Sequence, residues 1–201
     1  RFAKFKAAVE ADSEGRATSV QEEIKFVLDR EELAHTLCDL QDTGKMPLRV
    51  THNDTKLNNI MIDDETGRAI CVIDLDTVMP GLSVNDFGDS IRFGANHSAE
   101  DERDLSKVNF DLPLFDIYTK GFLEGAAGTL TDAEKEYLPW GAKLMTLECG
   151  IRFLTDYLQG DTYFKVSRAR QNLERCRTQF KLVADMENVW DEMASIVKKY
   201  S

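Results

Sequence analysis

The sequence lacks several features that mark common functional classes. Asp and Glu outnumber Lys and Arg by 36 to 25, which gives a formal net charge of −11. The chain therefore offers no basic surface for nucleic acid or for an acidic membrane. No apolar run approaches the roughly 20 residues that cross a bilayer, and no secretory signal is visible. These absences predict a cytoplasmic protein without nucleic-acid or membrane partners.

Cysteine is also scarce, and its spacing excludes the common metal and redox motifs. The four cysteines are Cys38, Cys71, Cys149 and Cys176, and no two of them form a C-x-x-C pair. Cys71 lies in a strand pattern, whereas Cys149 and Cys176 lie in helical patterns. We therefore expect buried free thiols, which fits a reducing cytoplasm; disulfides are the alternative.

The sequence does contain enough apolar residues to form the core of one domain or one large lobe, since 42% of its 201 residues are hydrophobic. Apolar positions recur at helical spacing in five segments, and two of these open with capping boxes, at Ser19 and Thr131. The expected class is α+β, mainly helical, with one small β-hairpin. The expected helices cover residues 2–15, 19–44, 112–123, 131–158 and 167–200, and a further helix opens near Asn85.

The most specific pattern lies between positions 52 and 76. Asp54 follows His52 by two residues, Asn59 follows Asp54 by five, and Asp74 closes an apolar strand at 69–73. Protein kinases use the same order of a catalytic-loop Asp, an Asn on Mg²⁺ and a later Asp on Mg²⁺. A His-x-Asp pair alone is usually structural, whereas the complete set predicts a phosphoryl-transfer site.

Local geometry leads to the same expectation. Residues 60–62 and 70–73 have strand character, and the turn formers at 63–68 separate them. A hairpin that pairs position 59 with position 74 brings Asn59 and Asp74 together at its open end, just downstream of Asp54. Carboxylate and amide oxygens gathered in this way can hold a hard cation such as Mg²⁺.

With these residues in place, the chain resembles the aminoglycoside phosphotransferase family of the protein-kinase-like superfamily. The His-x-Asp-x₄-Asn loop and the hairpin that ends in Ile73-Asp74 carry the resemblance. It implies that residues 1–201 form the helical C-terminal lobe of that fold. Leu57 departs from the family pattern, because many members have a loop-shaping Pro there. Within the family, the loop and the segment that follows Asp74 look most like the N-acetylhexosamine 1-kinases, which phosphorylate the anomeric hydroxyl of GlcNAc or GalNAc from ATP.

The resemblance implies roles for the motif residues. Asp54 accepts the proton of the acceptor hydroxyl, and Asn59 and Asp74 bind the Mg²⁺ that bridges the ATP phosphates. His52 orients the catalytic loop by hydrogen bonding, and Asp86 braces the loop from a helix.

Two further side chains are candidates for supporting roles. Asp76 follows Asp74 by two residues, so on an extended segment both would face the same side and Asp76 could support the metal site. Lys56, two residues after the base, either contacts the γ-phosphate or is an exposed loop lysine.

Arg152 is a candidate for the acceptor pocket because it interrupts the most apolar stretch of the helix at 131–158. An isolated interior charge is very costly. Either a neighbouring acid pairs with Arg152, or Arg152 lines a polar cavity and donates hydrogen bonds to sugar oxygens. Tyr163 is placed to reach the same cavity. The resemblance adds Thr77 as a hydroxyl and Phe93 as an aromatic wall of the sugar site.

The sequence contains no Gly-rich phosphate loop and no Val-Ala-Ile-Lys-like strand. In the family these belong to an N-terminal lobe, which we expect to precede the region seen here, and residues 1–201 alone would then be inactive or nearly so. Two alternatives stay open. One is a kinase of another small alcohol, such as choline, homoserine or an aminoglycoside, whose positive charges would favour an acidic pocket. The other is a non-catalytic module that binds nucleotide or sugar.

Overall fold

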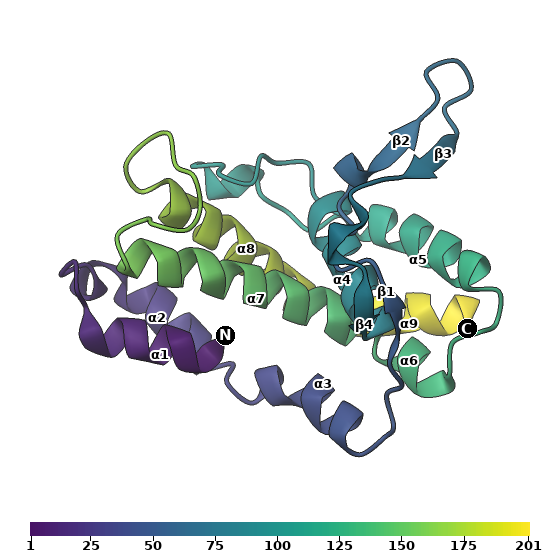
Figure 1. Cartoon of the computed structure of the whole chain (residues 1–201), viewed down its shortest axis with the longest axis horizontal. Coiled ribbons are helices and arrows are strands. Elements are labelled where there is room, and N and C mark those ends of the chain that lie inside the picture. The colour runs from purple at the N-terminus through teal and green to yellow at the C-terminus, as the bar shows by residue number, and fades with distance from the viewer.

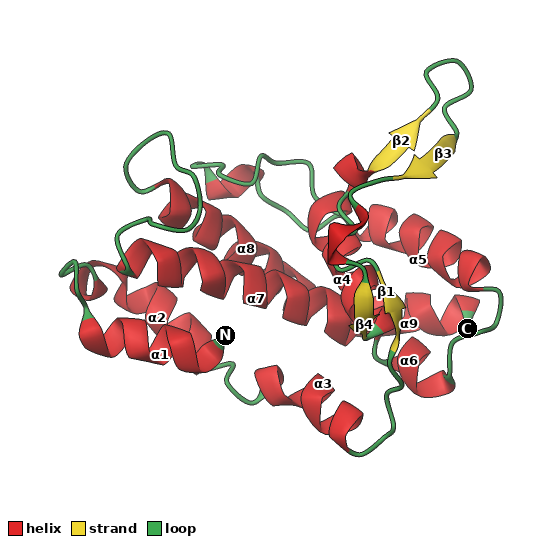
Figure 2. Ribbon diagram, in the orientation of Figure 1, coloured by secondary structure: helices red, strands yellow, loops and turns green.

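The structure is a computed structural model that describes residues 1–201, and it is a helical body from which one β-hairpin projects (Figures 1 and 2). This agrees with the α+β, mainly helical class predicted from the sequence. The helices are α1 (Phe2–Ala11), α2 (Gln21–Leu28), α3 (Leu33–Asp42), α4 (Ser83–Gly94), α5 (Leu112–Ala126), α6 (Asp132–Glu136), α7 (Leu138–Leu158), α8 (Gln171–Asn188) and α9 (Trp190–Tyr200). The strands are β1 (Arg49–Thr51), β2 (Ile60–Ile62), β3 (Ala69–Val72) and β4 (Met79–Gly81).

Helix α7 is the centre of the body, and every other helix except α5, which packs on α9 and α4, contacts it (Figure 1). Its C-terminal half packs with α1, α2 and α8 in one hydrophobic cluster. Its N-terminal half contributes to a second cluster with α4, α5 and α9. The partly buried Trp140 and Leu144 pack against both clusters, so α7 joins them into one continuous core.

The expected helix at 19–44 is wrong in detail, because the chain forms two helices there. A 3₁₀ turn at Ala17–Val20 precedes α2, and residues 29–32 separate α2 from α3. The capping box expected at Ser19 does not form. The Ser19 hydroxyl instead donates to the carbonyl of Arg16, at 2.7 Å, and the residue before α2 is Val20, which provides no side-chain cap.

The two other long helices are also interrupted. The capping box at Thr131 is confirmed, but its helix, α6, ends at Glu136 and α7 begins at Leu138. Pro139 lies in the first turn of α7, where its missing backbone N–H costs nothing because the first N–H groups of a helix have no partner within it. In the interior of a helix running on from α6, the same proline would break the hydrogen-bond pattern, so α6 ends before it. The helix expected at 167–200 is divided at Val189 into α8 and α9.

The four strands form two separate antiparallel pairs, β1 with β4 and β2 with β3. The predicted hairpin is confirmed, but its register is shifted by one residue. Ile60 pairs with Val72, and the Ile73 N–H donates to the carbonyl of Asn59 at 2.9 Å. Asn59 therefore lies opposite Ile73, the residue before Asp74, because it belongs to a 3₁₀ turn rather than to the strand.

Helix α4 crosses α7 at close range, and two glycines permit this. A Cβ at Gly88 would overlap the backbone of Gly141, and a Cβ at Gly141 would overlap the carbonyl of Val84. Both glycines lie at the crossing, so the backbones touch without side chains between them. The close contact fixes the position of α4, which supports the catalytic loop.

All four cysteines are free thiols. Cys149 and Cys176 are buried as expected, whereas Cys38 and Cys71 are exposed. The expectation for Cys71 was wrong because the hairpin projects from the body, so that every residue of β3 is exposed. None of the helices is both long enough and apolar enough to cross a membrane.

Candidate active site

The loop between β1 and β2 is attached to α4 by the carboxylate of Asp86 and by two hydroxyl groups. Asp86 accepts the backbone N–H of His52 on one oxygen and that of Asn53 on the other, both at 2.8 Å. Burial raises the pKa of Asp86, and these two N–H groups, which favour the carboxylate, offset part of the rise. Two hydroxyls complete the attachment: Thr55 donates to the carbonyl of Asp86 at 2.5 Å, and Ser90 donates to the carbonyl of Thr55 at 3.0 Å.

A second set of bonds joins the loop to the segment that contains Asp74. The His52 ring accepts the Asp54 N–H on Nδ1, at 3.3 Å, so its proton lies on Nε2, which donates to the carbonyl of Ile73 at 3.0 Å. The Thr77 hydroxyl donates to the carbonyl of His52 at 2.7 Å, and the Asn53 amide donates to the carbonyl of Thr77 at 2.9 Å. His52 and Thr77 thus fix the two segments relative to each other.

Strand β1, which leads into the loop, is anchored on its other side by a buried carboxylate. Glu134 is fully buried, and Arg49 donates to both of its oxygens, at 2.9 and 2.7 Å. The Ser83 hydroxyl at the start of α4 and the Thr131 N–H donate to it as well, each at 2.8 Å. Glu134 therefore links β1, α4 and α6 around the base of the loop.

Asp54 has one carboxylate oxygen engaged and one open. Its Oδ2 accepts from Lys56 at 2.6 Å and from the Asn59 amide at 2.9 Å, whereas Oδ1 accepts no hydrogen bond within the protein. Partial burial by itself would raise the pKa of Asp54, but the hydrogen bonds from Lys56 and Asn59 outweigh it, and the pKa lies below its usual value. The group is therefore ionised at neutral pH and has an oxygen free to accept a proton.

Asn59 and Asp74 each present an oxygen without a partner. The buried Asn59 uses its amide nitrogen on Asp54, which leaves its Oδ1 free. Asp74 has left-handed backbone angles, φ 63° and ψ 55°, and its carboxylate accepts no hydrogen bond within the protein. The hydrogen bond to Asp54 raises the pKa of Lys56, and the negative charges of Asp54 and Asp74 raise it further. The positive charge of Lys56 is thus surrounded by the carboxylates of Asp54, Asp74 and Asp89.

These oxygens fit the requirements of Mg²⁺ in a nucleotide site. No group of three or more His, Cys, Asp or Glu side chains forms a metal site in the chain. Mg²⁺ does not need one, because it binds through one or two protein ligands together with water and substrate phosphates. The premise for Asp76 was wrong, since residues 75–77 form a 3₁₀ turn rather than an extended segment.

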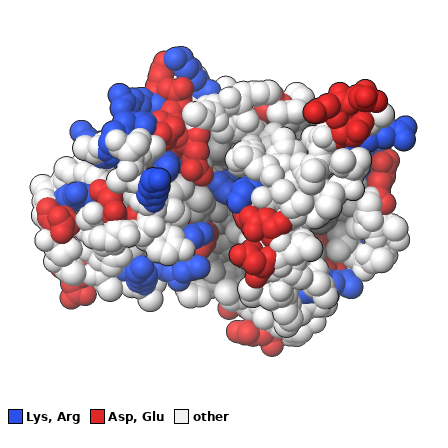
Figure 3. Space-filling model, turned by 45° about the horizontal axis from the view of Figure 1, so that its top comes forward, with Lys and Arg blue, Asp and Glu red and all other residues white.

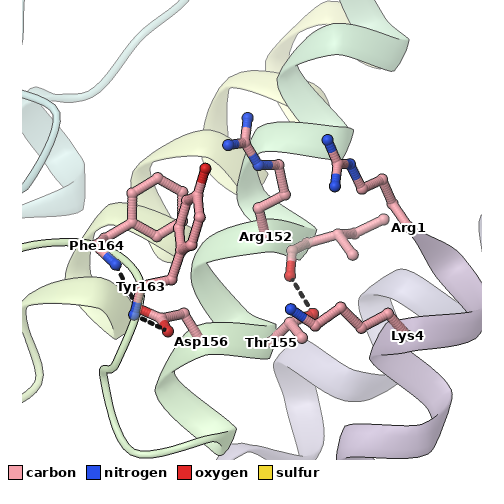
Figure 4. Close-up of a pocket in the computed structure, with 8 residues that line it drawn as sticks. Arg1, Lys4, Arg152, Thr155, Asp156, Tyr163 and Phe164 are labelled. Carbon is pink, nitrogen blue, oxygen red and sulfur yellow. Dashed lines mark hydrogen bonds between the residues drawn. The ribbon is translucent and has the colours of Figure 1, made fainter.

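Two of the four predicted acceptor residues lie together in one pocket (Figure 4). The Arg152 guanidinium lies 5.9 Å from the centre of the Tyr163 ring and 5.2 Å from that of Phe164. Its only acidic partner is Glu148, at 3.9 Å, so Arg152 has a neighbouring acid and also lines a cavity; its hydrogen bonds to sugar oxygens stay a prediction. The pocket is lined by Arg1, Lys4, Ile151, Arg152, Thr155, Asp156, Tyr163 and Phe164.

The pocket is basic, although the chain as a whole is strongly acidic. Arg1, Lys4 and Arg152 bring three positive charges to it, against the one carboxylate of Asp156. Glu148 pairs with both arginines, at 2.9 Å from Arg1, whereas Lys4 has no ion pair. Figure 4 shows the guanidinium groups of Arg1 and Arg152 extending in the same direction, with the aromatic rings facing Arg152.

The two other predicted acceptor residues lie elsewhere. Thr77 is beside the catalytic loop, where its hydroxyl is engaged by His52. Phe93 is on α4, 38% exposed, and it is not among the residues that line the pocket of Arg152.

Charged groups on α4 lie near Lys56 of the loop and near Cys149 of α7. Asp89 contributes to the charge around Lys56 and pairs with Arg92 at 2.9 Å. Burial raises the pKa of Cys149 on α7 to about 12, and the nearby guanidinium groups of Arg92 and Arg152 offset part of this rise. The face shown in Figure 3 is hollowed near its middle, and acidic and basic side chains both reach the walls of the hollow.

Sequence reasoning missed six of the eight pocket residues: Arg1, Lys4, Ile151, Thr155, Asp156 and Phe164. Asp156 had a usable signal, because it follows Arg152 by four residues and so shares a helix face with it. Lys4 had none, since it lies far away in sequence.

The model of the phosphotransferase enzyme family matches residues 2–116. The matched span includes the catalytic loop, the hairpin and α4. It ends within α5, before Arg152 and Tyr163.

Proposed function

The chain belongs to the phosphotransferase enzyme family, and from that premise we propose that the whole protein is an ATP-dependent kinase of a small hydroxyl compound. We propose the anomeric hydroxyl of an N-acetylhexosamine, GlcNAc or GalNAc, as the acceptor, and the cytoplasm as its location. Family membership supports a kinase-type phosphotransferase. The acceptor and the roles of single residues are our proposal.

The observation that supports catalysis most strongly is the state of Asp54. Its Oδ2 is held by Lys56 and Asn59 at 2.6 and 2.9 Å, and its Oδ1 is open. An ionised carboxylate fixed in this way can accept the proton of an acceptor hydroxyl as the phosphoryl group is transferred. A module that only bound its ligand would have no need of an oriented base.

Asn59 and Asp74 would hold Mg²⁺ through their free oxygens. A metal held there with ATP would neutralise charge on the phosphates. Lys56 already faces this group of acids, and its ammonium would approach the transferred phosphoryl group. Asp86 and His52 keep the loop in place through the backbone and ring hydrogen bonds described above. These are positioning roles.

The basic pocket favours a neutral acceptor over the cationic alternatives. Aminoglycosides and choline are positively charged, and each would meet Arg1, Lys4 and Arg152, of which only the arginines have an acidic partner. A neutral sugar would instead receive hydrogen bonds from the fork of Arg152 and lie against the Tyr163 ring. Thr77 and Phe93 would contribute a hydroxyl and an aromatic wall nearer to Asp54.

We further propose that residues 1–201 are the C-terminal lobe of the enzyme and that an N-terminal lobe covers ATP. The exposed apolar side chains of the hairpin, among them Met61, Ile70 and Val72, each at least 49% exposed, are consistent with a surface that another part of the protein covers. Without that lobe, residues 1–201 are expected to have little or no activity.

An acceptor screen with the full-length protein tests this proposal. ATP consumption is measured with GlcNAc, GalNAc, choline, homoserine, an aminoglycoside or no acceptor, and the product is examined for phosphate at the anomeric position. The proposal expects turnover with GlcNAc or GalNAc and none with choline or the aminoglycoside. Turnover only with a cationic acceptor would contradict it.

A further inference from the structure

The aromatic wall of the basic pocket is not part of a helix or strand. Tyr163 and Phe164 lie in the connection between α7 and α8, and Tyr163 is 71% exposed. A surface connection of this kind is ordinarily mobile. A pocket that is to select its ligand needs its walls fixed before the ligand arrives.

One buried carboxylate holds this connection. Asp156 on α7 is only 4% exposed, and its two oxygens accept four hydrogen bonds. Oδ1 accepts the backbone N–H of Thr162 at 3.0 Å and of Tyr163 at 2.8 Å. Oδ2 accepts the N–H of Phe164 at 3.0 Å and the Asn172 amide at 2.9 Å. Three successive backbone amides therefore converge on one side chain.

The start of the connection is held by a second group of contacts. The Asn172 amide also donates to Asp161 at 3.0 Å, and Arg16 donates to Asp161 at 2.6 Å and to the carbonyl of Tyr157 at 2.7 Å. Asp161 has a positive φ of 60°, which is uncommon for a non-glycine residue, although Asp adopts it more often than most. Asn172 thus joins both groups of contacts at the first turn of α8.

We infer that Asp156 is a positioning residue for the acceptor pocket, which holds the rings of Tyr163 and Phe164 against Arg152. Arg152 and Asp156 are four residues apart on α7 and so lie on one face of the helix. That face carries both the cation of the pocket and the anchor of its aromatic wall. The inference rests on the proposed function in one respect only, namely that this pocket receives the acceptor.

Asp156→Asn in the full-length protein tests the inference. The variant keeps the size of the side chain but replaces one acceptor oxygen by an NH₂ group, which cannot accept from the loop. Hydrogen exchange at the amides of 162–164 should become about tenfold faster, as expected for the loss of hydrogen bonds to a charged acceptor. The KM for GlcNAc should rise about tenfold because the aromatic wall is displaced, whereas the KM for ATP should stay within a few-fold.

Asp185→Asn is the matched control. Asp185 also accepts the backbone N–H of a connecting segment, that of Phe110 at 3.2 Å, but it does not line the pocket. It should cost stability and leave the KM for GlcNAc unchanged. If Asp156→Asn does not fold, Asn172→Ala is the second variant, since it removes the amide that bonds both Asp156 and Asp161 and leaves the three backbone contacts of Asp156 in place.

A double-mutant cycle separates positioning from general destabilisation. In a Tyr163→Ala background the wall has already lost a ring, so Asp156→Asn should raise the KM for GlcNAc by much less than in the wild type. Equal effects in both backgrounds, or unchanged exchange at 162–164, would overturn the inference. Absence of GlcNAc turnover in the wild type would contradict the proposed function instead, and the exchange experiment would still decide whether Asp156 holds the loop.

Discussion

Glu134 offers a quantitative test of how the base of the catalytic loop is held. Replacing it by Gln keeps the shape of the side chain and removes the charge that Arg49 meets with two hydrogen bonds, at 2.9 and 2.7 Å. The same change weakens the bonds from Ser83 and Thr131. Because Glu134 has no exposed surface, water cannot replace these partners.

The expected magnitude follows from its ionisation. Burial alone would raise the pKa of Glu134, but hydrogen bonds from Arg49, Thr131 and Ser83 lower it from 4.5 to about 2. A folded-state pKa below the unfolded value stabilises the fold above pH 4.5, and this contribution is lost as the pH falls from 4.5 toward 2. This lowering of the Glu134 pKa corresponds to about 3 kcal/mol of folding free energy at most. Arg49 is 34% exposed, so solvent screens part of its attraction to Glu134. We therefore expect Glu134→Gln to lower the free energy of unfolding by about 1–2 kcal/mol.

The assay is urea unfolding of the wild type and Glu134→Gln at pH 7, 4.5 and 3. Glu134→Gln should be less stable at pH 7, and the difference should shrink as the pH falls below 4.5. Glu136→Gln is the control, because Glu136 is an exposed carboxylate of the same helix without hydrogen-bond partners. A difference between the wild type and Glu134→Gln that stays constant across this range would refute the electrostatic account of the contact.

Three further outcomes are expected. Asp74→Ala should raise the Mg²⁺ concentration needed for activity, since one of two protein oxygens for the metal is lost; an unchanged Mg²⁺ titration would remove Asp74 from the site. Arg152→Ala should raise the KM for GlcNAc and leave the KM for ATP within a few-fold, and a parallel rise of both would assign Arg152 a structural role only. Gly141→Ala should lower the free energy of unfolding by about 1–3 kcal/mol, because its Cβ would overlap the Val84 carbonyl. Gly94→Ala on α4, whose Cβ would meet nothing, should cost no stability, and equal losses in both would contradict the close-crossing argument.

The sequence predicted the catalytic loop and hairpin because their signals are local. The spacing of Asp54, Asn59 and Asp74 and the turn formers at 63–68 all lie within 25 residues, and the hairpin follows from them. The one-residue error in register came from treating Asn59 as part of the strand. Its 3₁₀ turn depends on the bonds that its amide makes to Asp54, which no periodicity reports.

The interrupted helices and the pocket were harder to predict, for different physical reasons. Apolar periodicity shows which face of a helix is buried but not whether the helix is continuous, so the breaks at 29–32 and at Val189 were missed. Pro139 was a usable signal for the break before α7 and was overlooked. The pocket combines α1 with the connection after α7, and contacts between residues so distant in sequence cannot be deduced from spacing. Cys71 was misjudged because an apolar strand is usually buried, whereas this hairpin projects from the body.

The central claim is that Asp54 is the base of a phosphoryl transfer to a sugar hydroxyl, and single-turnover kinetics of Asp54→Asn in the full-length protein test it most directly. The variant keeps the shape of the side chain but cannot accept the proton. The account predicts that the rate of phosphoryl transfer from ATP to GlcNAc falls by roughly 10²–10⁴-fold, while GlcNAc binding, measured by calorimetry, is nearly unchanged. A variant that transfers phosphate at close to the wild-type rate would contradict the account.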